Sequence, residues 1–345
     1  MAATDPPLAD SYRTLLRRDE LGRALARESL AVLQLDLPMI DLKRLTSGDA
    51  RERNACAGAM ASAASEWGFF QVTNHGVGRE LLQEMRREQA RLFHQPFHAK
   101  EKAGFLDGSY RWGNPTATSL RQLSWSEAFH VPLARISEED DGEHAELSSL
   151  RGVMQEVAAA MSRVADTVAW TLVKNLGHAG STFPAAAGCD GTTCFLRLNR
   201  YPACPFAADT LGMVPHTDSD FLTVLCQDQV GGLELMKDSH WVAVKPHADA
   251  LIVNVGDLFQ AWSNNRYKSV EHRVVANSKA ERFSVAYFMC PSWDSPVGTC
   301  AEPSPYKPFT FGEYRRKVQD EVTRTGKKIG LPNFLKGSTV DGLTE

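Results

Sequence analysis

The stretch from about residue 194 to residue 291 is the feature that most limits how this chain can fold. It divides into short β-rich runs with turn residues between them, at close and regular spacing. The runs read CFLRLNRYP, GMVPHTD, LTVLCQD, GGLELMKDSHWVAVKP, ALIVNVGD, SVEHRVVAN and RFSVAYFMCP. Many short strands separated by turns are typical of a β-sandwich or barrel. We therefore expect a double-stranded β-helix, or jelly roll, in which KDSHW forms a hairpin turn.

Helical patterns surround this β-rich stretch. The clearest is at 147–176, where apolar residues recur at steps of three and four and Gly177 stands where a helix would stop. Shorter patterns lie at 11–30, 51–67, 79–96 and 310–326. We expect a mixed α and β fold, with a jelly-roll core wrapped by helices. Its expected parts are a mostly helical N-terminal region (1–190), the jelly-roll core (191–300) and a helical C-terminal tail (301–345).

Composition excludes several classes of protein. The formal net charge is −4, from 38 basic and 42 acidic residues, so we expect no surface for nucleic acid or an anionic membrane. No apolar run is long enough to span a bilayer, and the N-terminus lacks a signal-peptide pattern. Seven scattered cysteines without a C-x-x-C pair favour reduced thiols over a disulfide framework. We expect a cytoplasmic protein, with a nuclear location and the oligomeric state left open.

Two polar residues interrupt one of the β-rich runs. His216 and Asp218 in VPHTDSDF are two residues apart, so on a strand they project from the same face. Alone, such a pair could be an ordinary polar pair on a surface. His272 lies on a later expected strand, and a jelly roll brings such strands side by side. The three could form a two-histidine, one-carboxylate set, which leaves three positions of an octahedral metal open.

Two further groups of polar residues share strand faces. Arg282 and Ser284 in RFS present a guanidinium and a hydroxyl together, a combination that could clamp the far end of a dicarboxylic cosubstrate. The alternative for Arg282 is a surface arginine on an edge strand. Arg197, Asn199 and Tyr201 alternate onto one face of RLNRYP, where an ordinary exposed polar face is the alternative.

Together, the motifs H-x-D…H, R-x-S and N-x-Y-P resemble those of the Fe(II)- and 2-oxoglutarate-dependent dioxygenases of plants. The resemblance extends through GDLFQAWSNNRYKSVEHRV (256–274) and ASEWGFFQVTNHGV (64–77), and so covers nearly the whole chain. Within that family, YRWGNPTATS (110–119) and LSWSEAFHVPL (123–133) look like gibberellin 2-oxidases, particularly the subgroup acting on twenty-carbon gibberellins.

The resemblance implies a set of cofactors and roles. Fe(II) and 2-oxoglutarate would be required, with dioxygen as the second cosubstrate and ascorbate as a reductant. The implied reaction is gibberellin 2β-hydroxylation, which inactivates the hormone and releases succinate and CO2. The implied iron ligands are His216, Asp218 and His272, and the implied 2-oxoglutarate contacts are Arg282, Ser284, Tyr201 and Asn199.

A gibberellin is a rigid apolar ring system that bears carboxylates, so its site should combine apolar walls with a cation. Arg197 is the candidate cation, and Phe288 is a candidate wall because it shares a strand face with Arg282 and Ser284. The gibberellin-like motifs add Trp112, Trp125 and Phe129 as candidate pocket or lid residues. Core packing is the alternative for each of these aromatic residues.

Two other functions stay open. One is a plant 2-oxoglutarate-dependent dioxygenase that oxidises another gibberellin carbon or a flavonoid-like substrate. The other is a gibberellin-binding protein that keeps the fold without turnover, although a pure binder has no need of open metal positions. The absence of P-loop, G-x-S-x-G and H-E-x-x-H motifs argues against nucleotide hydrolysis, serine hydrolysis and zinc proteolysis.

Overall fold

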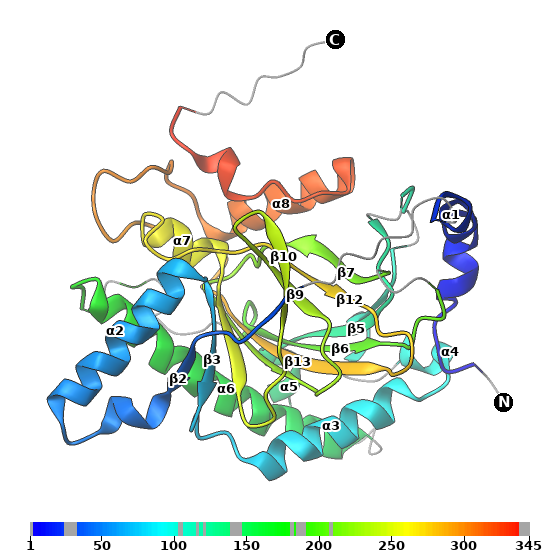
Figure 1. Ribbon diagram of the computed structural model, residues 1–345, viewed down its shortest axis with the longest axis horizontal. Helices are drawn as coiled ribbons and strands as arrows, with labels where there is room; N and C mark the ends of the chain where they lie inside the picture. Colours follow the sequence, from blue (N-terminus) through cyan, green and yellow to red (C-terminus); the bar gives the residue numbers. More distant parts are fainter. Residues whose placement is uncertain are drawn as a thin grey trace.

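The computed structural model describes residues 3–23, 33–102, 106–114, 117–119, 122–138, 147–179, 183, 191–206 and 210–337. There the chain forms two β-sheets wrapped by helices (Figure 1). The helices are α1 (Leu8–Arg23), α2 (Ala50–Glu66), α3 (Arg79–Phe93), α4 (Phe97–Lys100), α5 (Leu133–Ser137), α6 (Ser148–Asn175), α7 (Asp257–Trp262) and α8 (Phe311–Thr325), with 3-10 turns at Leu42–Thr46 and Leu331–Phe334. The strands are β1 (Leu33–Leu35), β2 (Met39–Asp41), β3 (Phe69–Thr73), β4 (Tyr110–Trp112), β5 (Glu127–Pro132), β6 (Phe195–Tyr201), β7 (Leu211–His216), β8 (Leu222–Gln227), β9 (Leu233–Lys237), β10 (His240–Val244), β11 (Leu251–Val255), β12 (His272–Val275) and β13 (Arg282–Met289).

The two sheets are built from strands that are far apart in the sequence. One has the order β1-β10-β9-β12-β7, and the other has the order β2-β3-β11-β8-β13-β6-β5-β4. A single apolar cluster joins them, since it contains Leu235 and Val274 of the first sheet and Phe69 and Ile252 of the second. This arrangement is the expected jelly roll.

Strand β11 shows how the eight-stranded sheet separates two environments. Leu251, Val253 and Val255 pack into the large core cluster that also contains the buried side of α6. Ile252 points the other way, into the cluster between the sheets, and Asn254 lines a cavity on that same side. The alternation follows from the two-residue period of a strand. Helix α6 contacts β8 and β13 from one face of this sheet, with α3 packed against α6 (Figure 1). The cavity lies on the other face of the sheet.

Local signals for turns and caps agree with the structure. Asp238 and Ser239, between β9 and β10, have φ values of 47° and 65°, as a two-residue type I′ hairpin requires. Helix α8 begins with a capping box between Thr310 and Glu313 and ends at Gly326 in the left-handed conformation. The predicted hairpin and the predicted C-terminal helix are both confirmed.

The N-terminal helix α1 lies against the segment that precedes β5. Leu8 and Tyr12 are buried in a small cluster with Trp125. The Tyr12 hydroxyl donates a hydrogen bond to the carbonyl oxygen of Ser124 at 3.2 Å and accepts one from the backbone N–H of Asn114. Helix α1 thus fixes a segment that lines the cavity described below.

The structure also bears on two expectations drawn from composition. Among the described residues, no helix combines the length and apolar character needed to cross a membrane. Cys194 is disulfide-bonded, so the expectation of reduced thiols is wrong at this position. In the part of the chain that the structure describes, the cysteines outside a disulfide are Cys56, Cys204, Cys226, Cys290 and Cys300.

Candidate metal centre and cosubstrate pocket

Two histidines meet because strands β7 and β12 are paired. β7 ends at His216 and β12 begins at His272, and the antiparallel register places these residues directly opposite each other. Asp218 follows β7, and its Oδ1 lies 3.6 Å from Nε2 of His216 and 3.8 Å from Nε2 of His272. One donor atom from each of the three residues lies within 4.8 Å of the others. These three side chains can therefore converge on one metal ion.

The two imidazole rings are oriented by the backbone. Nδ1 of His216 lies 2.8 Å from the carbonyl oxygen of Val214, and Nδ1 of His272 lies 3.1 Å from that of Val270. A proton on each Nδ1 completes these hydrogen bonds and leaves the Nε2 lone pair free for a metal. Burial, followed by the neighbouring His272, lowers the pKa of His216 to about 4. His216 is therefore neutral at physiological pH, as a ligand must be.

The carboxylate of Asp218 is held in a similar way. Its Oδ2 accepts hydrogen bonds from Thr223 Oγ1 at 2.6 Å and from Asn254 Nδ2 at 2.7 Å, so Oδ1 is left to face the histidines. Burial alone raises the pKa of Asp218, but the two histidines and these hydrogen bonds outweigh it and bring the pKa to about 2. The donor set is thus two imidazoles and one carboxylate, which suits a divalent iron with open positions.

The candidate cosubstrate residues come together through the pairing of β6 with β13. The two strands are antiparallel neighbours in the eight-stranded sheet. The register places Arg282 opposite Tyr201, Ser284 opposite Asn199, Ala286 opposite Arg197 and Phe288 opposite Phe195. Because alternate residues share a face, all eight side chains point to the cavity side of the sheet.

Arg282 is a buried cation without an anion. Only 2% of its surface is exposed, and its Nε has no hydrogen-bond partner. Its NH2 donates to Gln227 Oε1 at 2.8 Å, and the guanidinium carbon lies 4.9 Å from the centre of the Tyr201 ring. In the described part of the chain, no carboxylate lies within ion-pair distance of it. An unpaired buried charge costs several kcal/mol, so this position is suited to an anionic ligand such as the distal carboxylate of 2-oxoglutarate.

The metal ligands and the β6/β13 residues line one cavity of about 470 Å³. That volume lies in the usual range for small-molecule sites. The candidate substrate residues Arg197 and Phe288 both line it. Phe288 stacks on Phe195 with ring centroids 4.3 Å apart, and Phe195 stacks on His130 at 3.9 Å. The three rings form an apolar wall next to the Arg197 guanidinium.

The other three candidate substrate residues do not line this cavity, which corrects that expectation. Phe129 is fully buried and packs against Phe93 and Tyr110, because on β5 it faces away from the cavity that its neighbour His130 lines. Trp125 packs with the residues of α1 and with Phe206. Trp112 lies edge-on to Phe97, on the outer strand of the sheet.

Several cavity residues had no role assigned from the sequence. Gly113, Asn114 and Ser124 come from the same two motifs as the tryptophans, so these motifs do contribute to the cavity, and Gln122 lies between them. Helix α8 and the turn after it add Arg315, Val318, Val322 and Lys328. Thr223 and Asn254 hold Asp218, and of these two only Asn254 stands out in the sequence, because it is the one polar residue in the apolar run LIVNV.

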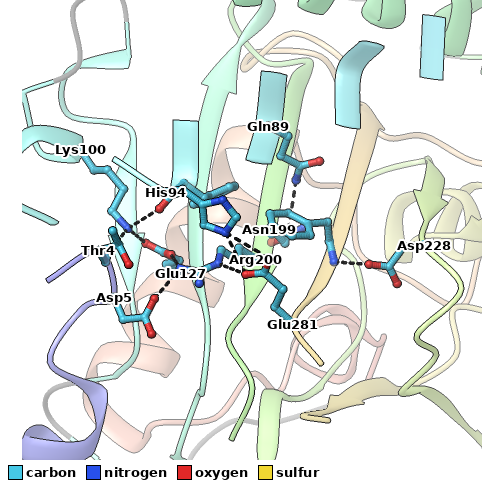
Figure 2. A network of polar contacts seen from close by, with 12 residues as sticks. Thr4, Asp5, Gln89, His94, Lys100, Glu127, Asn199, Arg200, Asp228 and Glu281 are labelled. Atoms are coloured by element: carbon cyan, nitrogen blue, oxygen red, sulfur yellow. Dashed lines mark hydrogen bonds and ion pairs between the residues drawn. The ribbon is translucent and has the colours of Figure 1, made fainter. Parts of the chain in front are cut away.

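The other side of β6 and β13 is held by polar contacts, which Figure 2 shows. Gln89 of α3 is buried, and its Nε2 donates to the carbonyl oxygens of Asn199 at 3.1 Å and Ser284 at 2.8 Å. A single helix side chain therefore bridges the backbones of both strands at Asn199 and Ser284, two of the residues whose side chains face the cavity.

A cluster of charges adjoins this bridge (Figure 2). Arg200 pairs with Glu127 at 2.7 Å, with Glu281 at 2.8 Å and with Asp5 at 2.8 Å. Lys100 is completely buried and pairs with Glu127 at 2.5 Å. Because Asp5 precedes α1, this cluster also attaches the N-terminal segment to the sheet.

Comparisons with known proteins agree with this geometry. Residues 192–291 match the model of the 2OG-Fe(II) oxygenase superfamily, and residues 37–158 match the model described as non-haem dioxygenase in morphine synthesis N-terminal. Among curated proteins, the chain is 73% identical to Gibberellin 2-beta-dioxygenase 6 of Oryza sativa subsp. japonica, with 98% of each chain covered. It is 48% identical to Gibberellin 2-beta-dioxygenase 8 of Arabidopsis thaliana, with 96% of this chain and 98% of the relative covered.

Solved structures show the same fold. A crystal structure of JOX2 in complex with 2OG, Fe and JA matches with a TM-score of 0.71 and 31% identity, over 91% of this chain and 97% of that one. The rice dioxygenase for auxin oxidation matches with a TM-score of 0.70 and 29% identity, over 87% of this chain and 100% of that one.

The metal geometry predicts that His216→Ala and Asp218→Ala will abolish Fe(II) binding and the release of succinate from 2-oxoglutarate. Each substitution removes one of three donors, and three ligands are the full protein contribution to this kind of site. Anaerobic Fe(II) titration and a succinate assay measure the two losses, with circular dichroism as the check on folding. Normal turnover by either folded variant contradicts the assignment of the iron ligands.

The unpaired guanidinium predicts a different defect for Arg282→Ala. Loss of a charge-assisted, bidentate partner should raise the KM for 2-oxoglutarate by about 10-fold or more, with a smaller change in kcat at saturating cosubstrate. Initial rates at varied 2-oxoglutarate concentration measure this split. An unchanged dependence on 2-oxoglutarate means that Arg282 does not bind the distal carboxylate.

Proposed function

This chain belongs to the 2OG-Fe(II) oxygenase superfamily, and on that premise we propose that it catalyses the 2β-hydroxylation of gibberellins. The observation that carries the proposal is the joint geometry of one cavity. Three metal donors converge at its wall, while the buried Arg282 guanidinium faces the same space without an anion. The similarity to curated gibberellin 2-beta-dioxygenases over the full length of the chain supports the choice of substrate.

The residues fit the cofactor and cosubstrate of this family. In the proposed complex, His216, Asp218 and His272 hold Fe(II). When bound, Fe(II) and 2-oxoglutarate supply the oxidation: dioxygen is consumed, 2-oxoglutarate becomes succinate and CO2, and one oxygen atom is added to the substrate. Ascorbate as a reductant stays a prediction.

The chain itself binds and orients the reactants. Arg282 and Ser284 are proposed to hold the distal carboxylate of 2-oxoglutarate. Tyr201 and Asn199 extend the same surface. The Tyr201 ring can approach β7 closely because Gly212 has no Cβ; a Cβ there would lie 2.6 Å from the ring. A cosubstrate held in this way would leave the rest of the cavity for the gibberellin.

Two cations are available for the carboxylates of the substrate. Arg197 has its Nε hydrogen-bonded to Asn199 at 2.8 Å but no carboxylate partner in the described part of the chain. For Arg315, the described residues provide neither an ion pair nor a hydrogen bond. Burial, then Arg197, then Arg315 lower the pKa of His130 to about 3, so both guanidiniums act on this wall of the cavity. His130 is neutral at physiological pH and contributes an apolar ring.

The other functions that the sequence left open differ from the proposed one in their products. A dioxygenase of other regiochemistry would oxidise a different gibberellin carbon, and a flavonoid-type enzyme would prefer another substrate. A non-catalytic binder would hold gibberellin without forming succinate. Preference for the twenty-carbon class, dioxygen as cosubstrate and a cytoplasmic location are parts of the proposal that rest on the family resemblance and on composition.

The proposal predicts the product of a defined reaction. The metal-free enzyme is reconstituted anaerobically with Fe(II) and then incubated in air with 2-oxoglutarate and a panel of twenty-carbon and nineteen-carbon gibberellins. We expect mass spectrometry to show the addition of one oxygen atom, and NMR to place a β-hydroxyl on carbon 2. Oxidation at another carbon favours the rival dioxygenase, and binding without any oxidised product favours the binder.

The role of Arg315 can be tested against its neighbour on α8. Arg315→Met should raise the KM for gibberellin by roughly 10-fold, the usual effect of losing one charge-assisted hydrogen bond, while leaving the KM for 2-oxoglutarate unchanged. Arg316→Met is the matched control, because Arg316 is exposed and does not line the cavity. Equal KM values for gibberellin in the two variants contradict the assignment.

A further inference from the structure

The turn after helix α8 places a lysine against the loop that carries the metal ligands. Nζ of Lys328 lies 2.8 Å from the carbonyl oxygen of Thr217, the residue between His216 and Asp218. It also lies 2.8 Å from Ser219 Oγ and 2.6 Å from Asp257 Oδ2. The side chain of Lys328 is 10% exposed and that of Asp257 is 5% exposed, so this is a largely desolvated pair.

These contacts use all three N–H donors of the Lys328 ammonium group. Although Lys328 lines the cavity, it is therefore already paired, unlike Arg197 and Arg315. Its location fits a role in holding the protein rather than in binding the substrate. Two of its three acceptors, Thr217 and Ser219, flank Asp218 directly.

Asp257, at the start of α7, is the common acceptor of this group. Its Oδ2 accepts hydrogen bonds from Thr217 Oγ1 at 3.0 Å and from the Tyr314 hydroxyl, in addition to the Lys328 ammonium. Its backbone N–H donates to the carbonyl oxygen of Asp218 at 3.0 Å. The metal-ligand loop is therefore fixed to α7 on one side and to the C-terminal turn on the other.

The C-terminal turn that carries Lys328 is itself fixed by hydrogen bonds to α8. Glu321 is 1% exposed and accepts hydrogen bonds from the backbone N–H groups of Ile329 at 2.9 Å and Gly330 at 3.1 Å. Gly330 has a φ of 72°, and a Cβ there would lie 2.9 Å from the Tyr314 hydroxyl. Figure 1 shows α8 lying across the β-structure, with this turn following it.

We propose that Lys328 is a positioning residue for the metal centre: it fixes the carbonyl of Thr217 and so aligns His216 and Asp218 on the iron. The inference rests on the iron site proposed above. Residue 328 lies outside both segments that the family models match, 37–158 and 192–291. The C-terminal turn thus completes a site whose ligands all come from the jelly-roll core.

The test is Lys328→Met, which keeps much of the side-chain length but removes the ammonium. Loss of such an outer contact typically weakens metal binding or activity by 10–100-fold, so we expect Fe(II) to bind about 10-fold more weakly. Anaerobic Fe(II) titration of the metal-free enzyme in the presence of 2-oxoglutarate, followed by visible absorption of the chelate, measures this. With saturating Fe(II), succinate formed per hydroxylated gibberellin should rise, because a misaligned metal uncouples the two. The KM for gibberellin should change little.

Three further variants separate positioning from general destabilisation. Lys327→Met is the matched control, since Lys327 is exposed and adjacent, and it should behave like the wild type. Lys328→Arg keeps a donor and a positive charge and should recover part of the Fe(II) affinity. The pair Asp257→Asn with Lys328→Met removes the unpaired carboxylate along with the lysine. If Lys328→Met alone does not fold, this double variant is measured in its place to test the positioning role.

The outcomes distinguish this inference from the function on which it rests. Failure of the wild-type enzyme to bind Fe(II) removes the iron site and with it the proposed function. If the wild type binds Fe(II) and the folded Lys328 variants match it in both affinity and coupling, the positioning role is wrong and the function stands. A rise confined to the KM for gibberellin would instead make Lys328 a substrate contact, which also overturns the proposal.

Discussion

The antiparallel register between β6 and β13 is the constraint on which the rest of the site depends. Seven consecutive residue pairs define it, and four of them place cavity residues opposite one another. A shift of one residue would turn the Arg282 guanidinium and its neighbours toward the helices, because the side chains of a strand alternate between its two faces. Gln89 opposes such a shift, since its amide bonds to both backbones at fixed positions. The chemistry of the cavity is therefore secured by contacts on the opposite face of the sheet.

The buried charges on that opposite face also depend on fixed partners. Replacing a buried ion pair by apolar residues is often neutral for stability, whereas removing one partner leaves a buried charge and is strongly destabilising. Lys100, Glu127 and Arg200 are all buried, so these positions depend on one another. Asp5 completes the cluster from the N-terminal segment, and Tyr12 of α1 then fixes the loop that lines the cavity. The ends of the chain, outside the segments that the family models match, thus take part in shaping the cavity.

The sequence predicted those parts of the site that rest on local periodicity. The faces shared by His216 and Asp218, and by Arg282 and Ser284, follow from spacing alone, and the jelly-roll prediction brought His272 to the first pair. Contacts between distant segments were not accessible in this way. Nothing near Lys328 or Arg315 in the sequence indicates that α8 reaches the cavity. Phe129 shows the limit of motif reasoning: it belongs to a segment that does line the cavity, but strand parity turns it into the core while His130 faces the site.

Four cations line the cavity in the described part of the chain; one is matched to an anion of the protein, one is assigned to the proposed cosubstrate, and two are left over. Lys328 is paired within the protein, with Asp257. Arg282 lacks an anion and lies next to Ser284, where the distal carboxylate of 2-oxoglutarate is proposed to bind. Arg197 and Arg315 are left on the wall next to the neutral His130. Asp218 is the one ionised carboxylate among the metal ligands, so a divalent iron adds net positive charge to the cavity. The remaining positive charge favours a substrate that is apolar in its rings and anionic in its substituents, which is the chemical character of a gibberellin.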